Sequence, residues 1–473
     1  MNILEQIVAH RRADLRQKGY DPGRTVPGKR SVPLVPFGRD PFLICEIKRK
    51  SPSKGDISIS MDALVQAQKY RDGGVRSVSI LTEPNYFGGS LADLTAVKKQ
   101  YPDLSVLRKD FLLTPEDIRI SYRAGADAVL LIAAILAKEE LEEMCYLAGE
   151  LGMEALVEVH TPEDVEKAAP VKPGLVGINS RDLTSFTIDL CHPLKVKRVI
   201  TWNPRLVFES GISSREHAVF ALSSGFKGLL VGEAVVKNPA LMGELIDSFN
   251  PAESNSFWER LYGGSRPLVK LCGLTREKDV RLADDLGADI LGFILAPSPR
   301  RVVPEFIRGL TRTRALKAGV VVLSRGEDLP GEIASLLEDG YLDVIQFHGD
   351  EKPEDCFTRA FPYYKALRIK DEADVERMEE YRCPRVLVDA FSAETRGGTG
   401  LRIDSGLIEK AAGKAPLWLA GGINPGNIRR IVTGYAPELV DVSSGLESAP
   451  GIKDKDKVEK FFKELDHETD HAG

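Results

Sequence analysis

Acidic and basic side chains alternate where an apolar segment near the start of the chain ends. Residues Leu43–Ile47 form a short apolar run that carries one acid, Glu46, and Lys48 follows the run. Such a run is typical of a buried strand, and residues two apart on a strand point to the same side. A carboxylate and an ammonium group side by side could supply a base and an acid to a bound substrate. Taken alone, the pattern could equally be a strand followed by a solvated basic turn.

Groups of the same kind end most of the other short apolar segments in the first half of the chain. Together with Glu46 and Lys48, the residues at these ends are Thr82 with Glu83, Lys109 with Asp110, Glu158, Asn179 with Arg181, Glu209 with Ser210, and Gly232 with Glu233. A lysine surrounded by carboxylates keeps its proton, whereas a carboxylate walled by apolar residues holds its proton more tightly. If these segment ends meet in space, they supply an acid and a base to one site.

The apolar segments recur with a regular spacing, which indicates how the chain brings their ends together. In the first half we expect strands at residues 42–47, 76–81, 104–107, 126–132, 154–159, 175–178, 206–208 and 228–231. Segments with helical periodicity separate them, and eight such strand–helix units are the number that closes a parallel barrel. The strands are apolar throughout rather than alternating, as expected for strands that are covered on both faces.

The same spacing begins again in the second half. Strands are expected there at residues 268–271, 290–295, 320–323, 344–347, 363–367, 386–388, 417–420 and 439–442. The sequence therefore predicts an α/β protein made of two tandem (β/α)8 TIM barrels. The alternative is a pair of open doubly wound sheets, which would be built from fewer units. In a barrel the functional groups lie at the C-terminal ends of the strands, and the ionisable residues stand at those ends.

A break in composition divides the chain into two domains. Residues 3–17 predict a helix that extends the first barrel at its N-terminus, and a Pro- and Gly-rich passage follows it. Residues 250–267 are polar and contain Gly, Pro and Ser, with a short helix predicted at 257–261. Such a composition is typical of a domain junction. We therefore expect a first barrel at residues 1–254, a linker at 255–266 and a second barrel at 267–473.

Composition and charge narrow the classes of partner. The 473 residues carry a net charge of -6 with both signs interspersed, which argues against nucleic acid or an anionic membrane as the main partner. No apolar run is long enough to span a bilayer, and the first helix is charged and unlike a signal peptide, so a cytoplasmic location is expected. The six cysteines form no C-x-x-C pair, which argues against a zinc site and against a disulfide framework.

Glycines near the ends of the last two strands of each half predict phosphate-binding loops. They are Gly211 and Gly232 in the first half, and Gly421, Gly422 and Gly445, with Ser444 beside it, in the second half. Glycine lets backbone N–H groups approach an anion closely, which is how barrels usually hold a phosphate. The chain has neither G-x-x-x-x-G-K-[ST] nor G-x-G-x-x-G after a strand, so a nucleotide has little support. A phosphosugar fits better.

At this point both halves resemble known families. The first half closely resembles indole-3-glycerol-phosphate synthase through CEIKRKSPSKG (45–55), LRKDF (107–111), EVH (158–160), GINSRDL (177–183) and ESGI (209–212). The second half resembles phosphoribosylanthranilate isomerase through KLCGLT (270–275), PR (299–300), QFHG (346–349), VD (388–389), GGTG (397–400), AGGI (420–423) and DVSSG (441–445). The resemblance implies a bifunctional enzyme of tryptophan biosynthesis, with small-molecule phosphosugar–anthranilate substrates and no cofactor or metal.

The isomerase family performs an Amadori rearrangement of phosphoribosylanthranilate to the open-chain carboxyphenylamino-deoxyribulose phosphate. The resemblance implies that Asp389 protonates the furanose ring oxygen, which opens the ring to a Schiff base. Cys272, as a thiolate, would then take the proton from the second carbon of the sugar. Arg300 would pair with the anthranilate carboxylate, because its planar fork of donors suits that group. His348 is expected to be structural.

The synthase family closes the indole ring with loss of carbon dioxide and water. The resemblance implies that protonated Lys109 is the general acid that polarises the ketone, and that Glu158 removes the ring proton or helps to expel the hydroxyl group. Glu46 would assist through hydrogen bonds to the sugar and the lysines. The remaining expected roles are the substrate carboxylate for Lys48 and Arg181, substrate hydroxyl groups for Asn179 and Ser210, and the phosphate for Ser51, Gly211 and Gly232.

Two readings from other classes stay open at this stage. Lys109 at a strand end could form a Schiff base, which would make the first barrel an aldolase. Alternatively, either barrel could bind a phosphosugar without turning it over, although the many acids and bases exceed what a phosphate loop alone requires. For the assembly we expect a monomer.

Overall fold

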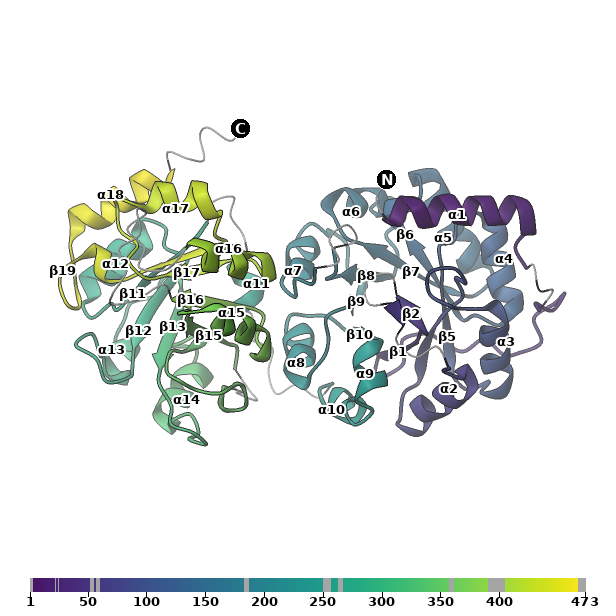
Figure 1. Ribbon diagram of the computed structural model, residues 1–473, viewed down its shortest axis with the longest axis horizontal. Coiled ribbons are helices and arrows are strands. Elements are labelled where there is room, and N and C mark those ends of the chain that lie inside the picture. Colours follow the sequence, from purple (N-terminus) through teal and green to yellow (C-terminus); the bar gives the residue numbers. More distant parts are fainter. Residues whose placement is uncertain are drawn as a thin grey trace. The chain divides into compact units, whose positions relative to one another are not determined.

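The computed structural model describes residues 3–21, 23, 25–51, 55–56, 60–182, 187–249, 257–262, 267–356, 361–389 and 405–466. The chain forms two compact units, Met1–Ser254 and Asn255–Gly473, which are drawn in purple to teal and in teal to yellow in Figure 1. Each unit contains one closed barrel of parallel strands. Both the two barrels and the N-terminal helix that the sequence predicts are confirmed, and the open doubly wound alternative is wrong.

The first barrel follows the order of the chain, with β1 closing against both β4 and β10. Its strands are β1 (Leu43–Ile47), β4 (Ser77–Leu81), β5 (Ser105–Lys109), β6 (Ala128–Ile132), β7 (Glu154–Val159), β8 (Leu175–Asn179), β9 (Arg205–Glu209) and β10 (Gly228–Val231). The helices around it are α2 (Ala63–Asp72), α3 (Leu91–Gln100), α4 (Pro115–Ala124), α5 (Lys138–Glu150), α6 (Pro162–Ala168), α7 (His192–Lys197), α8 (Arg215–Ser223), α9 (Glu233–Lys237) and α10 (Leu241–Asp247).

Local sequence explains where several of these helices begin. The side chains of Asp62, Thr161 and Ser214 accept hydrogen bonds from the first backbone N–H groups of α2, α6 and α8. Such capping satisfies donors that a helix leaves without a partner at its N-terminus. The loops before α6 and α8 are short, residues 160–161 and 210–214, so their side chains are held near the ends of β7 and β9.

The N-terminal helix α1 (Ile3–Lys18) lies against the first barrel through polar and apolar contacts. Arg11 forms an ion pair of 2.7 Å with the buried Asp117 of α4. His10 stacks on Tyr86, which belongs to the loop after β4. Ile7 is buried in the same cluster as Phe111 and Leu130 of the barrel. Residues 3–18 therefore form part of the wall of the barrel mouth.

The second barrel also follows the order of the chain. Its strands are β11 (Leu268–Cys272), β12 (Ile290–Ile294), β13 (Leu316–Val321), β14 (Val344–Phe347), β15 (Tyr363–Arg368), β16 (Val386–Asp389), β17 (Trp418–Ala420) and β18 (Leu439–Val442). Its helices are α12 (Glu277–Asp285), α13 (Pro304–Arg308), α14 (Gly331–Glu338), α15 (Glu372–Arg377), α16 (Ser405–Lys414), α17 (Ile428–Tyr435) and α18 (Lys455–Asp466), and a hairpin of β19 (Glu447–Ala449) and β20 (Ile452–Lys453) follows β18.

In the second unit one expected strand is misplaced, whereas the short helix expected before the barrel is present. The prediction of a strand at 320–323 is wrong by several residues, since β13 spans Leu316–Val321. Lys317 and Gly319 interrupt the apolar run there, so the sequence pattern placed the start of the strand too late. The short helix expected near residue 257 is present as α11 (Phe257–Leu261), and its Trp258 packs 5.9 Å from the ring of Trp418. The described part of the expected linker is therefore packed against the second barrel.

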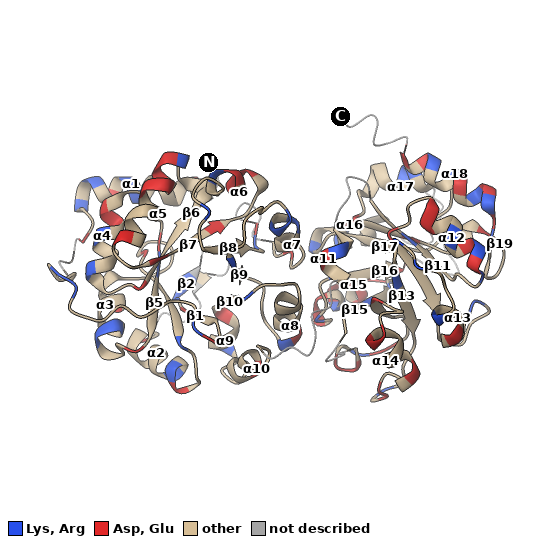
Figure 2. Ribbon diagram, turned by 180° about the vertical axis from the view of Figure 1, so that it is seen from behind, with Lys and Arg blue, Asp and Glu red and all other residues tan. Residues whose placement is uncertain are grey.

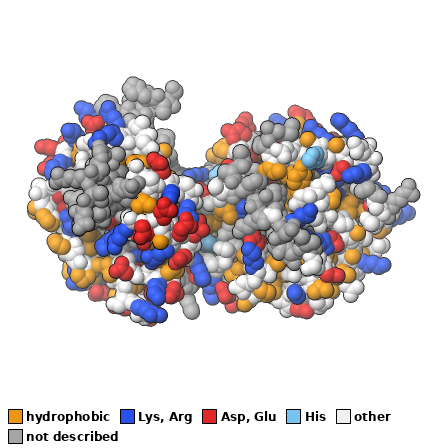
Figure 3. All heavy atoms as spheres, viewed as in Figure 1, with side chains coloured by type: hydrophobic (Ala, Val, Ile, Leu, Met, Phe, Trp, Pro, Cys, Tyr) orange, Lys and Arg blue, Asp and Glu red, His pale blue; other side chains and the backbone are white. Residues whose placement is uncertain are grey.

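Charged side chains of both signs lie on the outer helices of each unit. Figure 2 shows Lys and Arg next to Asp and Glu along helices such as α3 and α18. Figure 3 shows both signs intermingled on the face in view of each unit. Among the described residues, no helix combines the length and apolarity that a bilayer crossing requires. On these views, neither unit presents a face of a single charge sign.

Candidate active sites in the two barrels

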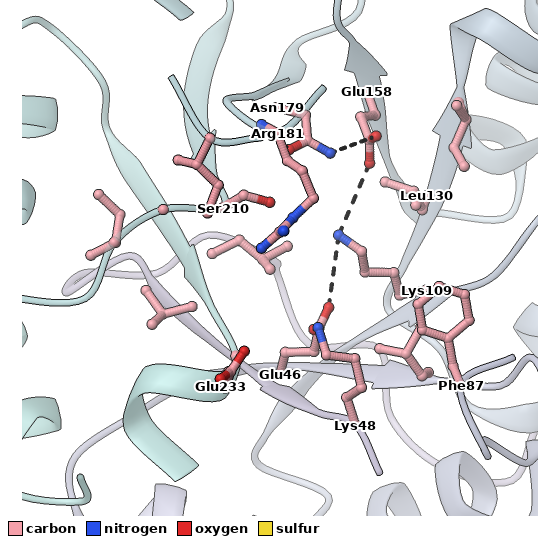
Figure 4. A pocket seen from close by; sticks show the side chains of 18 of the residues that line it. Glu46, Lys48, Phe87, Lys109, Leu130, Glu158, Asn179, Arg181, Ser210 and Glu233 are labelled. Atoms are coloured by element: carbon pink, nitrogen blue, oxygen red, sulfur yellow. Dashed lines mark hydrogen bonds and ion pairs between the residues drawn. The ribbon is translucent and has the colours of Figure 1, made fainter. Parts of the chain in front are cut away.

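A cavity of about 470 Å³ opens at the C-terminal ends of the first barrel's strands. Nine of the residues singled out from the sequence line it, namely Glu46, Lys48, Lys109, Glu158, Asn179, Arg181, Ser210, Gly211 and Gly232 (Figure 4). They come from β1, β5, β7, β8, β9, β10 and the residues that follow these strands. The topology of the barrel thus brings together residues that are up to 186 positions apart in the sequence, from Glu46 to Gly232.

Lys109 occupies the centre of the polar part of this cavity. Three carboxylates among the described residues lie within 4.0 Å of its Nζ atom, namely Glu209 at 2.9 Å, Glu46 at 3.8 Å and Glu158 at 4.0 Å. Burial opposes a charge on Lys109, but the carboxylates of Glu209, Glu46 and Glu158 outweigh it and raise the pKa of the ammonium group. Lys109 is therefore protonated at neutral pH and can act as an acid.

The carboxylates around Lys109 differ in their own protonation. Burial alone would raise the pKa of Glu46, but Lys48, whose Nζ lies 2.5 Å from Oε1, and Lys109 hold that pKa below its ordinary value. Burial raises the pKa of Glu209 to about 7, and neighbouring Glu158 adds to the effect while Lys109 opposes it. Lys109 thus lies between an ionised acid that lines the cavity, Glu46, and a buried acid that exchanges a proton near neutral pH, Glu209.

Glu209 is the residue of this group to which the sequence analysis gave no role. Its Oε1 atom is buried and has no hydrogen-bond partner among the residues that the structure describes. A Cβ atom at Gly177, on the neighbouring strand β8, would collide with this oxygen, so glycine is required there to make room for the carboxylate. The acid at the end of β9 was visible in the sequence, but its closeness to Lys109 depends on strand register and on that glycine.

Glu158 is held by a neighbouring amide. The Nδ2 of Asn179 donates a hydrogen bond of 3.1 Å to Glu158 Oε1, and the backbone N–H of Arg181 donates one of 3.0 Å to Asn179 Oδ1. Both oxygens of the Glu158 carboxylate are thereby engaged, one with Asn179 and the other facing Lys109. The dashed lines in Figure 4 show this arrangement.

The expected phosphate glycines Gly211 and Gly232 follow β9 and β10, and their neighbours Ser210 and Glu233 are labelled in Figure 4. Ser210 and Gly211 have positive φ values of 68° and 76°, and Gly232 begins α9. Glu233 also lines the cavity and forms an ion pair of 2.6 Å with Lys237. The backbone of Ser51 belongs to a two-residue strand (Lys50–Ser51), while its side chain lies outside the described residues.

Apolar residues form the remaining wall of the first cavity. They are Ile3, Leu4 and Ile7 of α1, together with Leu81, Phe87, Phe111, Leu130, Ile132, Ile188, Ile212, Leu230 and Val231. Glu83 shapes part of this wall because its carboxylate accepts hydrogen bonds from the backbone N–H groups of Asn85, Tyr86 and Phe87. The wall suits the aromatic ring of a ligand whose charged groups reach the polar side.

In the second barrel, Cys272 ends β11 and is buried. Burial raises the pKa of the Cys272 thiol, whereas the ammonium groups of Lys270 and Lys453 oppose that shift. Without a ligand the thiol is therefore not the thiolate that the reaction would require. Gly292 on β12 leaves the space for the sulfur, since a Cβ atom there would lie 2.7 Å from Sγ.

Asp389 ends β16 and lies opposite His348, with Oδ2 3.4 Å from Nε2. Tyr364 donates to Gln346 Oε1 at 2.9 Å, which directs the amide nitrogen of Gln346 toward His348 Nδ1 at 2.7 Å. Nδ1 therefore accepts, and the hydrogen of the ring stands on Nε2, facing Asp389. His348 thus contacts the expected acid directly.

Arg300 is already paired in the second unit. Its guanidinium group forms a bidentate ion pair with Glu447, with distances of 2.9 Å from Nε to Oε1 and 2.7 Å from Nη2 to Oε2. Lys453 also binds Glu447, and it donates to the backbone carbonyl oxygens of Cys272 and Ser443. The expected carboxylate-binding arginine is therefore held in place by an acid that sequence analysis did not single out.

The expected phosphate residues of the second barrel lie in the turns after β17 and β18. Gly421 and Gly422 have positive φ values of 92° and 71°, which favour glycine. Ser444 and Gly445 form a short 3-10 turn. A Cβ atom at Gly445 would collide with the backbone of Ile423, so these two turns pack directly against each other. The motif at 397–400 lies outside the described residues.

The fold and these sites define a class: a tandem pair of parallel eight-stranded barrels with acid–base groups and glycine turns at the strand ends. A family model for "Indole-3-glycerol phosphate synthase" matches residues 4–245, and one for "N-(5'phosphoribosyl)anthranilate (PRA) isomerase" matches residues 269–464. The chain therefore belongs to the indole-3-glycerol phosphate synthase family, and its second half carries a phosphoribosylanthranilate isomerase domain.

Individual relatives agree with this assignment. The chain is 28% identical to the "Tryptophan biosynthesis protein TrpCF" of Helicobacter pylori, over 98% of this chain and 99% of that protein. It is 30% identical to the "Multifunctional tryptophan biosynthesis protein" of Schizosaccharomyces pombe, of which it spans 66%. Its first half is 37% identical to the "Indole-3-glycerol phosphate synthase" of Bacillus mycoides, over 50% of this chain and 94% of the relative.

Proposed function

We propose that this chain catalyses two consecutive steps of tryptophan biosynthesis. The second barrel isomerises N-(5-phosphoribosyl)anthranilate to 1-(2-carboxyphenylamino)-1-deoxyribulose 5-phosphate. The first barrel then closes the indole ring, with decarboxylation and dehydration, to give indole-3-glycerol phosphate. The isomerisation is the reaction of an intramolecular oxidoreductase, and the ring closure is the reaction of a carboxy-lyase. The observation that carries the proposal is the protonated Lys109 among three carboxylates at the edge of an apolar-walled cavity.

In the first barrel the anthranilate ring lies against the apolar wall and the sugar phosphate against the glycine turns. Lys109 donates its proton to the ketone oxygen while the ring carbon that bears the carboxylate attacks the ketone carbon. Loss of carbon dioxide restores the aromatic ring, and the hydroxyl group leaves as water after a second protonation. Glu158, fixed by Asn179, removes the ring proton or assists the departure of the hydroxyl group. Lys48 and Arg181 bind the substrate carboxylate until it leaves.

In the second barrel Asp389 protonates the furanose ring oxygen, and the ring opens to a Schiff base. Cys272 removes the proton from the second carbon, and the enolamine then tautomerises to the ketone. Lys270 and Lys453 are the cations next to the thiol that support its deprotonation when the substrate is bound. Arg300 binds the anthranilate carboxylate, and Glu447 holds Arg300 in place before the substrate arrives.

The Schiff-base reading of Lys109 has less support. A lysine that attacks a carbonyl group must be neutral, whereas the carboxylates around Lys109 raise the pKa of its ammonium group. Treatment with borohydride and a keto-phosphate would trap a covalent adduct on Lys109 if that reading were right. A cytoplasmic location and a monomeric state also remain part of the proposal, on the grounds of the sequence.

The test is to give the purified chain phosphoribosylanthranilate in EDTA without any added cofactor. We expect the fluorescence of the substrate to fall and an indole product to appear. Loss of substrate without indole would support the isomerase and contradict the roles of Lys109 and Glu158. If neither signal changes, the open-chain intermediate is supplied separately. If no indole product forms from it either, the result would favour a module that only binds phosphosugars.

A further inference from the structure

Two histidines lie beside the first cavity without a role in the reaction. His160 directly follows β7, two residues after Glu158, and His192 is the first residue of α7. Their ring centroids are 4.3 Å apart, with the ring planes inclined by 34°. Neither ring is among the described residues that line the cavity. Their hydrogen bonds nevertheless lead to two residues of the site.

The partners of the two rings fix their tautomers. His160 Nδ1 lies 3.0 Å from the backbone carbonyl oxygen of Asn179, and His192 Nε2 lies 2.7 Å from the backbone carbonyl oxygen of His160. A carbonyl oxygen can only accept, so each of these nitrogens carries a hydrogen and donates it. His160 therefore carries a hydrogen on Nδ1, and His192 carries one on Nε2.

These bonds connect α7, the end of β7 and the end of β8. His192 holds the backbone of His160, and His160 in turn holds the backbone of Asn179. The side chain of Asn179 is fixed as well, because it accepts from the N–H of Arg181 and donates to Glu158 Oε1. Asn179 is thus held at its carbonyl group and at both atoms of its amide. The result is one orientation for the amide that directs the Glu158 carboxylate toward Lys109.

The surroundings of the two rings fit a purely positional task. Burial lowers the pKa of His192, and the neighbouring His160 lowers it further, so this ring stays neutral at neutral pH. His160 Nε2 lies 3.9 Å from an oxygen of Asp182. The backbone N–H of His160 donates to Asp164 Oδ2, which fixes the turn between β7 and α6. The neutral His192 ring fixes the backbone of His160, and the His160 ring in turn donates to Asn179.

We propose that His160 and His192 are positioning residues of the first barrel, which orient Asn179 and through it the carboxylate of Glu158. This inference rests on the proposed ring-closing reaction, in which Glu158 acts on the substrate. The competing explanation is that the two rings only fill space between α7 and β8. The two explanations differ in what a substitution that keeps the donated hydrogen bond should do.

Matched pairs of variants in the full chain separate the two explanations. An asparagine at position 160 can place its amide N–H near the position of Nδ1, whereas a leucine cannot donate. With the open-chain carboxyphenylamino-deoxyribulose phosphate as substrate, we expect His160→Leu to lower kcat by about tenfold to a hundredfold, as a misplaced catalytic group does. KM should change little, and His160→Asn should recover most of the lost kcat. His192→Leu and His192→Gln form the corresponding pair for Nε2.

The isomerase activity of the second barrel is the internal control for the amount of intact chain, and a denaturant titration of the first unit is the control for folding of each variant. Equal losses in the leucine and amide variants, an unchanged kcat in His160→Leu, or a loss confined to KM would each overturn the inference. If the parent chain itself forms no indole from the open-chain substrate, the proposed function fails instead. The two failures are therefore distinguishable in the same set of assays.

A second measurement does not depend on turnover. The chain has seven histidines, so the ring nitrogens of a chain with ¹⁵N-labelled histidine can be assigned by comparison with His160→Asn and His192→Gln. We expect the hydrogen on Nδ1 in His160 and on Nε2 in His192. An Nδ1 of His160 that carries no hydrogen would contradict the donation to Asn179, and with it the inference.

Discussion

Each barrel buries a lysine that faces carboxylates, but the two lysines stand at different depths. Lys109 is the last residue of β5, lines the cavity and has 17% of its side chain exposed. Lys270 lies two residues before the end of β11 and is fully buried, and among the described residues it forms an ion pair with one acid, Asp441, at 2.5 Å. The position along the strand therefore decides whether a lysine is accessible to a substrate. Lys109, at the strand end, lines the cavity, whereas Lys270, two residues before the strand end, is buried.

The balance of charge around the two lysines differs in the same way. Lys109 has three carboxylates within 4.0 Å among the described residues. The pKa of one of them, Glu209, is raised to about 7, so this carboxylate can exchange a proton near neutral pH. For Lys270, burial is outweighed by Asp441 and then by Cys272, which together raise the pKa of its ammonium group. The first arrangement suits proton transfer, and the second suits a fixed positive charge beside a thiol.

The largest effect is expected from Lys109→Met. Removing the general acid should lower the rate of indole formation from the open-chain intermediate by about 10²-fold to 10⁴-fold. The isomerase activity should stay within about twofold of the parent chain, because its residues belong to the other barrel. Steady-state assays with each substrate separately check both parts, and an unchanged rate of indole formation would contradict the assignment of Lys109.

A loss of similar or slightly smaller size is expected from Cys272→Ala, now confined to the isomerase. In the proposed reaction Cys272 removes the proton from the second carbon, so the rate should fall by about 10²-fold to 10³-fold. The decrease of phosphoribosylanthranilate fluorescence measures it. Cys356→Ala is the matched control, since Cys356 is also a buried thiol but ends no barrel strand. Equal losses in both variants would point to packing rather than to catalysis.

The third prediction concerns stability and distinguishes the two lysines directly. Lys270→Met leaves the buried Asp441 without its cation, which should lower the free energy of unfolding of the second unit by about 3–5 kcal/mol. Adding Asp441→Asn should recover part of that loss. Lys109→Met should cost the first unit less, because Glu46 and Glu158 line the cavity and the buried Glu209 can take up a proton near neutral pH. Denaturant titrations that follow each unit separately test the difference, and equal costs would remove the basis of the comparison.

The smallest effect is a change in pH dependence. The pKa of Glu209 is raised by burial to about 7 from an ordinary value of 4.5, so the folded chain keeps a proton that the unfolded chain has released in this window. The free energy of unfolding contributed by this group therefore falls as the pH rises from 4.5 toward 7. Glu209→Gln should remove this dependence, a change of about 2–3 kcal/mol between the two ends of the window.

Urea titrations of the parent chain and of Glu209→Gln at pH 5 and pH 7.5 measure that change, with Glu154→Gln as the control. Glu154 lies on β7, outside the cavity lining, and pairs with Arg205. Parallel pH profiles for the parent chain and Glu209→Gln would show that Glu209 is not the group that holds the proton.

Much of the first site follows from the sequence because one rule governs a barrel. Once eight strand–helix units are recognised, the residues at the strand ends must face one opening, and those at Glu46, Lys109 and Glu158 do line one cavity. The closeness of Glu209 to Lys109 could not be predicted in this way. It depends on the register of β8 and β9 and on the space left by Gly177.

Pairings between distant residues were beyond the sequence for the same physical reason. Arg300 and Glu447 are 147 positions apart, and the hairpin that carries Glu447 has no periodic signal that points to Arg300. The tautomers of His160 and His192 likewise depend on which carbonyl oxygens the fold brings to them. The strand β13 was misplaced because a lysine and a glycine break its apolar run. Local patterns predict elements, but contacts across the barrel need the fold.

The most direct test of the division of labour between the barrels is a mixing experiment with two full-length variants. Given phosphoribosylanthranilate, Lys109→Met should accumulate the open-chain carboxyphenylamino-deoxyribulose phosphate, and Cys272→Ala should leave the substrate unchanged. When the two variants are combined, we expect indole-3-glycerol phosphate to form at a rate limited by the slower active barrel. Formation of the indole product by Lys109→Met alone, or accumulation of the intermediate without indole in the mixture, would contradict the account.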